Sequence, residues 1–130
     1  MEQAIGRVAL MTRTLDINVQ GFGAFPTIRS PKLIWIGVNP TPALRCLKQD
    51  LEWSLTKCGF EREPRSFHPH LTLGRTSGND GAGSFRGLDE KAANIDYSSD
   101  IRIHKIDLMR SYTSDDGAQH ILHSSAKFGG

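Results

Sequence analysis

The chain has 130 residues, of which 38% are hydrophobic and 23% are charged, and its formal net charge is +2. This composition is ordinary for a globular protein of one domain. No apolar run approaches the ~20 residues that span a bilayer, and no basic-then-apolar signal peptide opens the chain, so we expect no membrane partner. The mildly basic charge permits a nucleic-acid partner without demanding one.

The two cysteines indicate the compartment. Cys46 and Cys58 are twelve residues apart in one helical pattern. On a helix that separation is about 18 Å, which is too far for a disulfide. We therefore expect reduced thiols in a cytoplasmic protein.

The first part of the chain predicts a helix followed by two strands. Apolar residues recur at helical spacing over 2–14, and strict alternation over 15–20 predicts a half-buried strand. Residues 21–26 are expected to end that strand, and 27–31 to form a polar loop. The nearly continuous apolar run 32–38 predicts a well-buried strand.

A long amphipathic helix comes next. Thr41 is a candidate N-cap, Pro42 suits the first helical position, and Gly59 suits the end. An apolar stripe follows the helical period between these signals. We expect Leu47 and Leu51 on this stripe to be buried against a sheet.

The last part of the chain predicts a mixture of elements. They are a flexible loop at 76–83, a short helix within 84–95, a strand at 101–109, a turn-rich loop at 111–117 and a final strand at 120–128. The apolar alternation changes phase near His104 and Lys105, which predicts a bulge there. The order of helices and strands predicts an α+β fold with antiparallel sheets.

Between the long helix and the flexible loop, residues 67–75 carry the main functional signal. Read as a strand, they alternate faces with period two. The faces are His70, Thr72 and Gly74 on one side and Leu71 and Leu73 on the other. We expect the leucine face in the core. An imidazole that moves protons near neutral pH, next to a hydroxyl donor, suits a phosphate ester in reaction.

Two other interpretations of this stretch remain open. An H-x-T triplet arises often by chance, and a histidine in a strand is usually a half-buried polar group. His68 and His70 also suggest a metal site, but no cysteine or carboxylate accompanies them at ligand spacing. We therefore expect no metal ligands.

Three blocks of sequence together resemble a known family. The first block comprises residues 21–26, Pro31 and 33–38. The second comprises residues 67–75, and the third comprises residues 106–111 and 117–118. In order and spacing they resemble the 2'-5' RNA ligase family, also called RNA 2',3'-cyclic phosphodiesterases, of the 2H phosphoesterase superfamily. The resemblance implies a 2H phosphoesterase fold, with residues 1–130 forming a single domain that needs no cofactor.

The resemblance also implies an activity and a set of residues. The family opens RNA 2',3'-cyclic phosphates to 2'-phosphates without a metal, and it reversibly joins RNA ends through 2'-5' linkages. His70 and Thr72 match the catalytic motif, and Arg75 and Phe67 are candidates for substrate binding. The expected partner is RNA with a 2',3'-cyclic phosphate or 2'-5' linked ends. Arginines 62, 65 and 110 are weaker candidates for the RNA backbone, and solvated surface charge is the simpler interpretation of each.

The main departure of the chain from the family concerns its H-x-T motifs. The family carries two H-x-T motifs that face each other across a cleft, and this chain matches only the second. The first is expected upstream of Met1, so the fold is expected to be N-terminally incomplete. His123-Ser124-Ser125 has the form H-x-S but lies where the family has an ordinary final strand.

Because one histidine cannot both activate water and protonate the leaving oxygen, two alternatives follow. In the first, the chain is a non-catalytic module that binds RNA ends or nucleotides. In the second, two chains pair as a homodimer or exchange strands, so that each supplies one His70.

Overall fold

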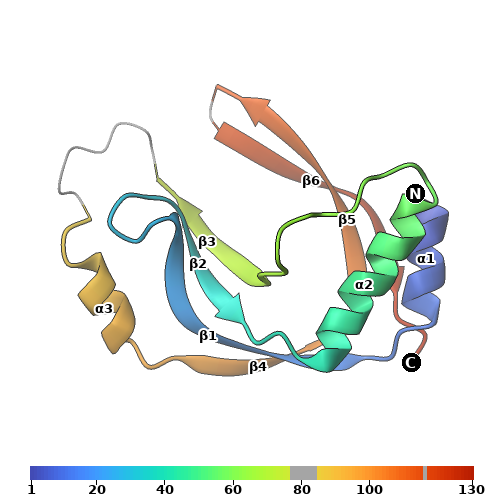
Figure 1. Cartoon of the computed structure of the whole chain (residues 1–130), viewed down its shortest axis with the longest axis horizontal. Helices are drawn as coiled ribbons and strands as arrows, with labels where there is room; N and C mark the ends of the chain where they lie inside the picture. The colour runs from blue at the N-terminus through green and yellow to red at the C-terminus, as the bar shows by residue number, and fades with distance from the viewer. Residues whose placement is uncertain (77–84, 116) are drawn as a thin grey trace. The chain divides into compact units, whose positions relative to one another are not determined.

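The computed structural model describes residues 1–76, 85–115 and 117–130 (Figure 1). Its elements are α1 (Glu2–Leu10), β1 (Leu15–Pro26), β2 (Pro31–Val38), α2 (Pro42–Thr56), β3 (His70–Arg75), α3 (Leu88–Asn94), β4 (Ser98–Ile103), β5 (Lys105–Ser114) and β6 (Gly117–Lys127). The strands form a four-stranded sheet of order β3-β2-β1-β4 and a separate β5–β6 pair. The expected α+β class with antiparallel pairing is confirmed. The expected loop at 76–83 lies, after Thr76, outside the described residues.

The chain divides into two compact units, and each is built from several segments. One unit comprises Met1–Leu15, Pro42–Ser66 and Arg102–Gly130, and the other comprises Asp16–Thr41 and Phe67–Ile101. The expected single domain over residues 1–130 stays a prediction. No helix among the described residues is long and apolar enough to cross a membrane.

The first unit is built around α1, which packs against α2, β5 and β6. Most of the buried side chains of this unit lie on α1, and they are Ala4, Ile5, Val8 and Ala9. The helix ends at Leu10, earlier than expected; the Thr12 hydroxyl donates to the carbonyl of Val8 at 2.7 Å, and the chain enters β1 at Leu15. The C-terminal residues run beside this end, since the Gly129 N–H donates to the carbonyl of Ala9 at 3.1 Å.

Helix α2 begins at Pro42, as its sequence predicts, and its last turn leads into Gly59 at a φ of +95°. The Phe60 N–H donates back to the carbonyl of Leu55 at 3.2 Å, which satisfies a carbonyl at the helix end. Leu47 is buried as expected, but Leu51 is only half-buried. The packing partner of α2 within its unit is α1, so the expectation that the stripe packs on a sheet is replaced by helix-on-helix packing.

Strands β5 and β6 form a long antiparallel hairpin. The strand expected over 101–109 is two strands, β4 and β5, which are separated at His104 rather than joined through a bulge. The His104 carbonyl accepts a hydrogen bond from the Phe128 N–H at 2.8 Å. The loop expected at 111–117 was also wrong, because ladder pairing continues to Ser114 opposite Gly117. Backbone pairing here overrides the turn-forming composition.

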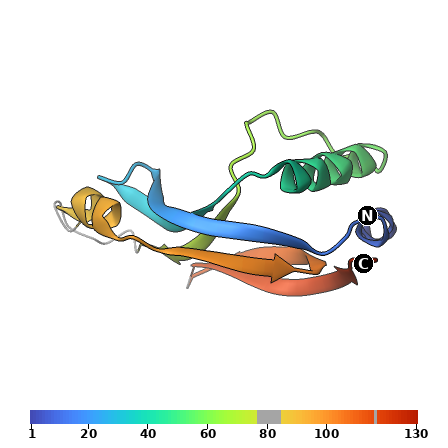
Figure 2. The ribbon, with the colours of Figure 1, turned by 90° about the horizontal axis from the view of Figure 1, so that it is seen from below.

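The second unit contains the four-stranded sheet, in which β1 lies between β2 and β4 (Figure 2). Asn18 on β1 links to β4, since its side-chain amide donates to the Ser98 hydroxyl and the Asp100 carboxylate, each at 2.9 Å. The expected end of the first strand at 21–26 was wrong, because β1 runs on to Pro26. Gly21, at a φ of +77°, lies where the register shifts, so the strand bulges and continues instead of ending.

Candidate functional site

The register of the sheet determines which side chains share a face with His70. Directly paired residues of antiparallel strands place their side chains on the same face. His70 pairs with Gly37, and Thr72 pairs with Trp35. Because β2 also pairs with β1, Phe25 joins this face opposite Leu33. We call the surface formed by Phe25, Trp35, His68, His70, Thr72 and Arg75 the aromatic face.

Arg75 reaches the aromatic face through a bulge. Ile34 pairs with Gly74, but the next residue, Trp35, pairs with Thr72, so Leu73 is an extra residue in β3. Beyond the bulge the alternation of β3 is reversed, and Arg75 pairs with Leu33 on the Trp35 side. Strict alternation predicts Gly74 on the face of His70. The register puts the Arg75 side chain on this face instead.

The leucine face of β3 is not buried, which corrects the expectation from alternation. Leu71 is 41% exposed and Leu73 is 56% exposed. Two features account for this exposure. β3 is an edge strand of its sheet, and within this unit α3 lies over Phe22 and Ile34 further along the sheet, where a cavity of about 180 Å³ separates the helix from the strands.

Aromatic rings pack closely around His70. Its ring centroid lies 5.3 Å from that of Phe25, 6.1 Å from that of Trp35 and 5.8 Å from that of His68. The Trp35 and His68 rings are 4.8 Å apart. The Trp35 indole lies directly over Gly23, where an added Cβ would stand 2.3 Å from Cη2 of the indole. Gly23 is therefore the residue that allows the indole to lie flat on β1.

His70 is held by a backbone contact that defines its chemistry. Its Nδ1 lies 2.7 Å from the carbonyl oxygen of His68. A carbonyl only accepts hydrogen bonds, so Nδ1 carries the hydrogen, and Nε2 of the neutral ring carries the lone pair. The ring is half-buried. It is thus oriented by the segment just before its strand, with Nε2 as the nitrogen that can accept a proton.

The other predicted site residues lie near His70 in different environments. Thr72 and Arg75 are exposed, and among the described residues neither has a hydrogen-bond or ion-pair partner. Phe67 is half-buried and lies before β3 rather than on it. The structure therefore brings together an imidazole, a hydroxyl and a guanidinium on one strand, which suits an anionic ligand.

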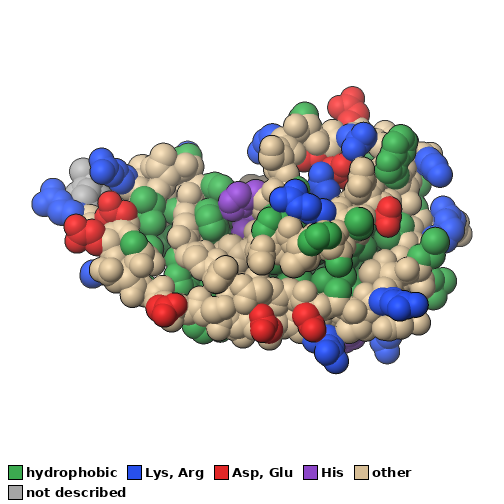
Figure 3. All heavy atoms as spheres, turned by 60° about the horizontal axis from the view of Figure 1, so that its bottom comes forward, with side chains coloured by type: hydrophobic (Ala, Val, Ile, Leu, Met, Phe, Trp, Pro, Cys, Tyr) green, Lys and Arg blue, Asp and Glu red, His purple; other side chains and the backbone are tan. Residues whose placement is uncertain are grey.

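A groove of about 440 Å³ lies next to this strand within the same unit. Its walls include Trp35, Phe67, His68, Pro69 and Gln20. His70 does not line this groove. Histidine side chains reach the surface among hydrophobic ones in Figure 3. Sequence reasoning missed Phe25 and Trp35, because only the strand register brings them to His70, and it missed that His68 lines the groove.

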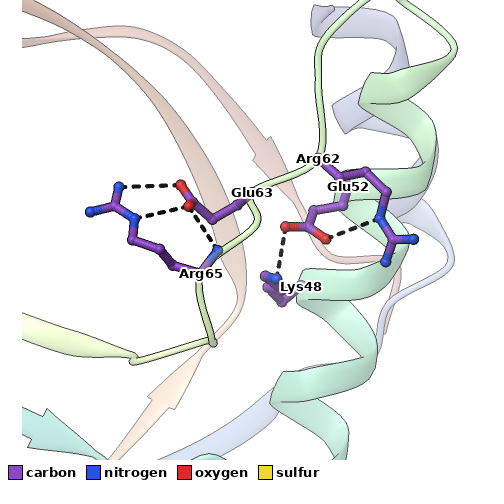
Figure 4. A network of polar contacts seen from close by, with 5 residues as sticks. All are labelled: Lys48, Glu52, Arg62, Glu63 and Arg65. Atoms are coloured by element: carbon purple, nitrogen blue, oxygen red, sulfur yellow. Dashed lines mark hydrogen bonds and ion pairs between the residues drawn. The ribbon is translucent and has the colours of Figure 1, made fainter.

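The weaker arginine candidates are held in surface contacts of the first unit (Figure 4). Arg62 lies 3.7 Å from Glu52 and stacks over Trp53, and Arg65 lies 2.9 Å from Glu63. The hydrogen bond from Arg65 lowers the pKa of Glu63. Lys48 does the same for the pKa of Glu52, with a smaller effect from Arg62. These pairs account for both arginines as surface charge, and the Arg110 guanidinium lies 3.5 Å from the Tyr112 hydroxyl.

The H-x-S triplet on β6 has partners of its own. His123 Nε2 lies 2.6 Å from the Glu2 carboxylate, and the Ser125 hydroxyl donates to Asp107 at 2.7 Å. In the part of the chain that the structure describes, no group of three or more histidine, cysteine or acidic side chains is arranged to hold a metal ion. Cys46 and Cys58 are both exposed free thiols.

Comparison with known proteins supports one family. The profile described as 2'-5' RNA ligase superfamily matches residues 1–115. The chain is 41% identical over 63 residues to the RNA 2',3'-cyclic phosphodiesterase of Aeropyrum pernix, covering 48% of this chain and 36% of that protein. It is 31% identical over 96 residues to the protein of the same name from Methanothermobacter thermautotrophicus, covering 74% and 51%. The chain thus spans between about a third and a half of the length of these curated relatives.

A solved structure supports the fold. The crystal structure of TT0787 of Thermus thermophilus matches with a TM-score of 0.70 at 15% identity, covering 99% of this chain and 68% of that one. The sequence match extends over most of the chain, and the fold match extends over nearly all of it. The chain belongs to the 2'-5' RNA ligase superfamily.

Proposed function

We propose that the aromatic face binds and opens RNA 2',3'-cyclic phosphates, with His70 as an acid/base group and Thr72 as a donor to the phosphate. The observation that carries this proposal is the 2.7 Å contact between His70 Nδ1 and the His68 carbonyl, which leaves Nε2 for proton transfer. The relatives that are named RNA 2',3'-cyclic phosphodiesterase support the substrate class.

The reaction needs two proton transfers. A water oxygen bonds to phosphorus while a base takes its proton, and the bond from phosphorus to O3' breaks while an acid protonates O3', leaving a 2'-phosphate. His70 supplies one of these transfers through Nε2, and the other proton is exchanged with solvent water. The Thr72 hydroxyl donates to a phosphate oxygen and stabilises the charge that develops there. No step uses a metal.

Arg75 and Phe67 complete the proposed substrate site. The bulge at Leu73 puts the exposed Arg75 guanidinium on the side of His70 and Thr72. A guanidinium pairs well with phosphate, so Arg75 is proposed to bind the same phosphate or its neighbour in RNA. Phe67 precedes His70 by three residues and is proposed to contact the nucleoside.

An alternative function is binding of RNA ends or nucleotides without turnover. The observation in its favour is that His123, the other histidine in a similar triplet, already contacts Glu2. Among the described residues, His70 is then the single histidine of an H-x-T or H-x-S triplet whose ring does not contact a carboxylate. Binding would need the hydroxyl and the guanidinium but no second proton-transfer group.

A second copy of the chain is the remaining alternative. The exposed Leu71 and Leu73 lie on an edge strand, and such edges favour pairing between chains. A homodimer or a strand exchange would bring a second His70 to the substrate. Sedimentation of the protein with and without a 2',3'-cyclic nucleotide distinguishes this arrangement from a monomer.

The test is hydrolysis of a 2',3'-cyclic nucleotide with identification of the product. We expect the 2'-phosphate, formed equally well with and without a chelator. Activity that a chelator abolishes and a divalent ion restores would overturn the metal-independent mechanism. Binding of the cyclic nucleotide without product would select the binding alternative, and the absence of both binding and product would overturn the proposal.

A further inference from the structure

The groove beside β3 has the lining of a site for a flat ring. Its walls are contributed by the rings of Trp35, Phe67 and His68, with Pro69 and the polar Gln20 beside them. Aromatic side chains are the usual platforms for unstacked bases of single-stranded nucleic acid, and the stacking tolerates any base. A volume of about 440 Å³ leaves room for a base with its ribose.

The groove lies next to the proposed phosphate site. Trp35 lines the groove, and its ring also lies 6.1 Å from that of His70. The segment Phe67–Pro69 forms one wall and leads directly into His70. This segment is fixed to the sheet, because the Val38 N–H donates to the Pro69 carbonyl at 3.0 Å. A single ribose joins a base to its own 2',3'-phosphate, so sites for the two must adjoin as these do.

We propose that this groove binds the nucleobase of the nucleotide whose cyclic phosphate lies at His70, by stacking on Trp35, Phe67 and His68. The inference rests on the proposed function and adds a base-binding site to it. Because the base is the same in substrate and transition state, this contact contributes uniform binding. Loss of the site is expected to raise KM and leave kcat unchanged, whereas loss of His70 lowers kcat.

The chain provides a fluorescent reporter for this test. It contains two tryptophans, and the other one, Trp53, is 54% exposed on α2. Trp53→Phe leaves Trp35 as the only tryptophan. Adenosine 2'-phosphate is then titrated against ribose 5-phosphate, which has a phosphate and no base. We expect the nucleotide to quench Trp35 fluorescence and the sugar phosphate to leave it unchanged.

Variants locate the binding site. Phe67→Leu keeps an apolar side chain and removes the ring. We expect it to weaken nucleotide binding by about 5- to 100-fold, which is the usual effect of removing an aromatic side chain that stacks on a base. His68→Leu is expected to have a smaller effect in the same direction. The matched control is Phe60→Leu, since Phe60 is 47% exposed after α2 and lies in the other unit. The melting temperature of each variant is recorded to exclude unfolding.

The outcomes separate the two proposals. Quenching by the nucleotide that Phe67→Leu weakens and Phe60→Leu does not would support the base site. A nucleotide that shifts the His70 imidazole resonances without quenching Trp35 would overturn the base site and leave the proposed function standing. A nucleotide that changes neither signal would overturn both. A variant with raised KM and unchanged kcat supports stacking, and one with lowered kcat alone contradicts it.

Discussion

The chain contains two triplets in which a histidine is followed, two residues later, by a residue with a hydroxyl. The side chains of the two triplets have different partners in the structure. In His70-Leu71-Thr72, the histidine contacts a backbone carbonyl two residues away, and the threonine hydroxyl has no partner among the described residues. In His123-Ser124-Ser125, the histidine contacts the Glu2 carboxylate and the serine donates to Asp107.

This difference shows what the spacing of a motif leaves open. Both triplets lie on strands, and both have the same local sequence pattern. His123 finds its carboxylate 121 residues away in the sequence, so no local pattern could reveal that it is engaged. A triplet is a candidate site only where the fold leaves both the imidazole and the hydroxyl available to a ligand.

The strongest test of the comparison is to remove each histidine in turn. We expect His70→Ala to lower turnover of a 2',3'-cyclic nucleotide by about 10²- to 10⁴-fold, the usual contribution of an acid/base group. His123→Ala is expected to leave turnover unchanged. If the chain only binds, the same contrast is expected in affinity for the nucleotide. Equal losses for the two variants at unchanged melting temperature would contradict the assignment.

The hydroxyls provide the next test. Thr72→Ala is expected to weaken phosphate binding or turnover by about 10- to 100-fold, because a hydrogen bond to a charged group contributes about 1.5–3 kcal/mol. Thr72→Ser keeps the hydroxyl and is expected to keep most of the activity. Ser125→Ala is the control on the other triplet. A Thr72→Ala variant that matched the wild-type protein in both assays would place Thr72 outside the site.

A pair of glycines tests whether packing orients the aromatic face. Gly23→Ala places a Cβ 2.3 Å from the Trp35 indole, whereas Gly74→Ala meets nothing within 4 Å. We expect Gly23→Ala to displace Trp35 and to destabilise the fold by about 1–3 kcal/mol, as overpacking does. Gly74→Ala is expected to change stability little. Denaturant unfolding of both variants, with tryptophan fluorescence, measures the contrast.

The smallest expected effect concerns the β6 triplet. The Ser125 hydroxyl lowers the pKa of Asp107, with a smaller contribution from Lys105. A lowered pKa in the folded state means that the contact stabilises above the unfolded-state pKa, and that this stabilisation is lost as the pH falls through the folded-state pKa. The difference in melting temperature between wild type and Ser125→Ala should therefore be small at neutral pH and shrink in acid. A difference that grew in acid would contradict this sign.

The sequence by itself determined the local elements that depend on short-range physics. Alternation predicted the start of β1, the nearly continuous apolar run at 32–38 predicted β2 from its second residue onward, and Pro42 marked the start of α2. The residues of the β3 block indicated the family, which the match over residues 1–115 confirms. These features follow from side-chain periodicity and turn chemistry, which are properties of neighbouring residues.

Only the tertiary structure decided which residues meet at the site. The bulge at Leu73 moves Arg75 to the side of His70, and strand pairing brings Phe25 and Trp35 there. The exposure of Leu71 also depends on its edge position rather than on its alternation. Register, bulges and edge positions arise from pairing between distant segments. A one-residue change in pairing reverses the face of every later side chain, and period-two alternation within one strand cannot reveal that change.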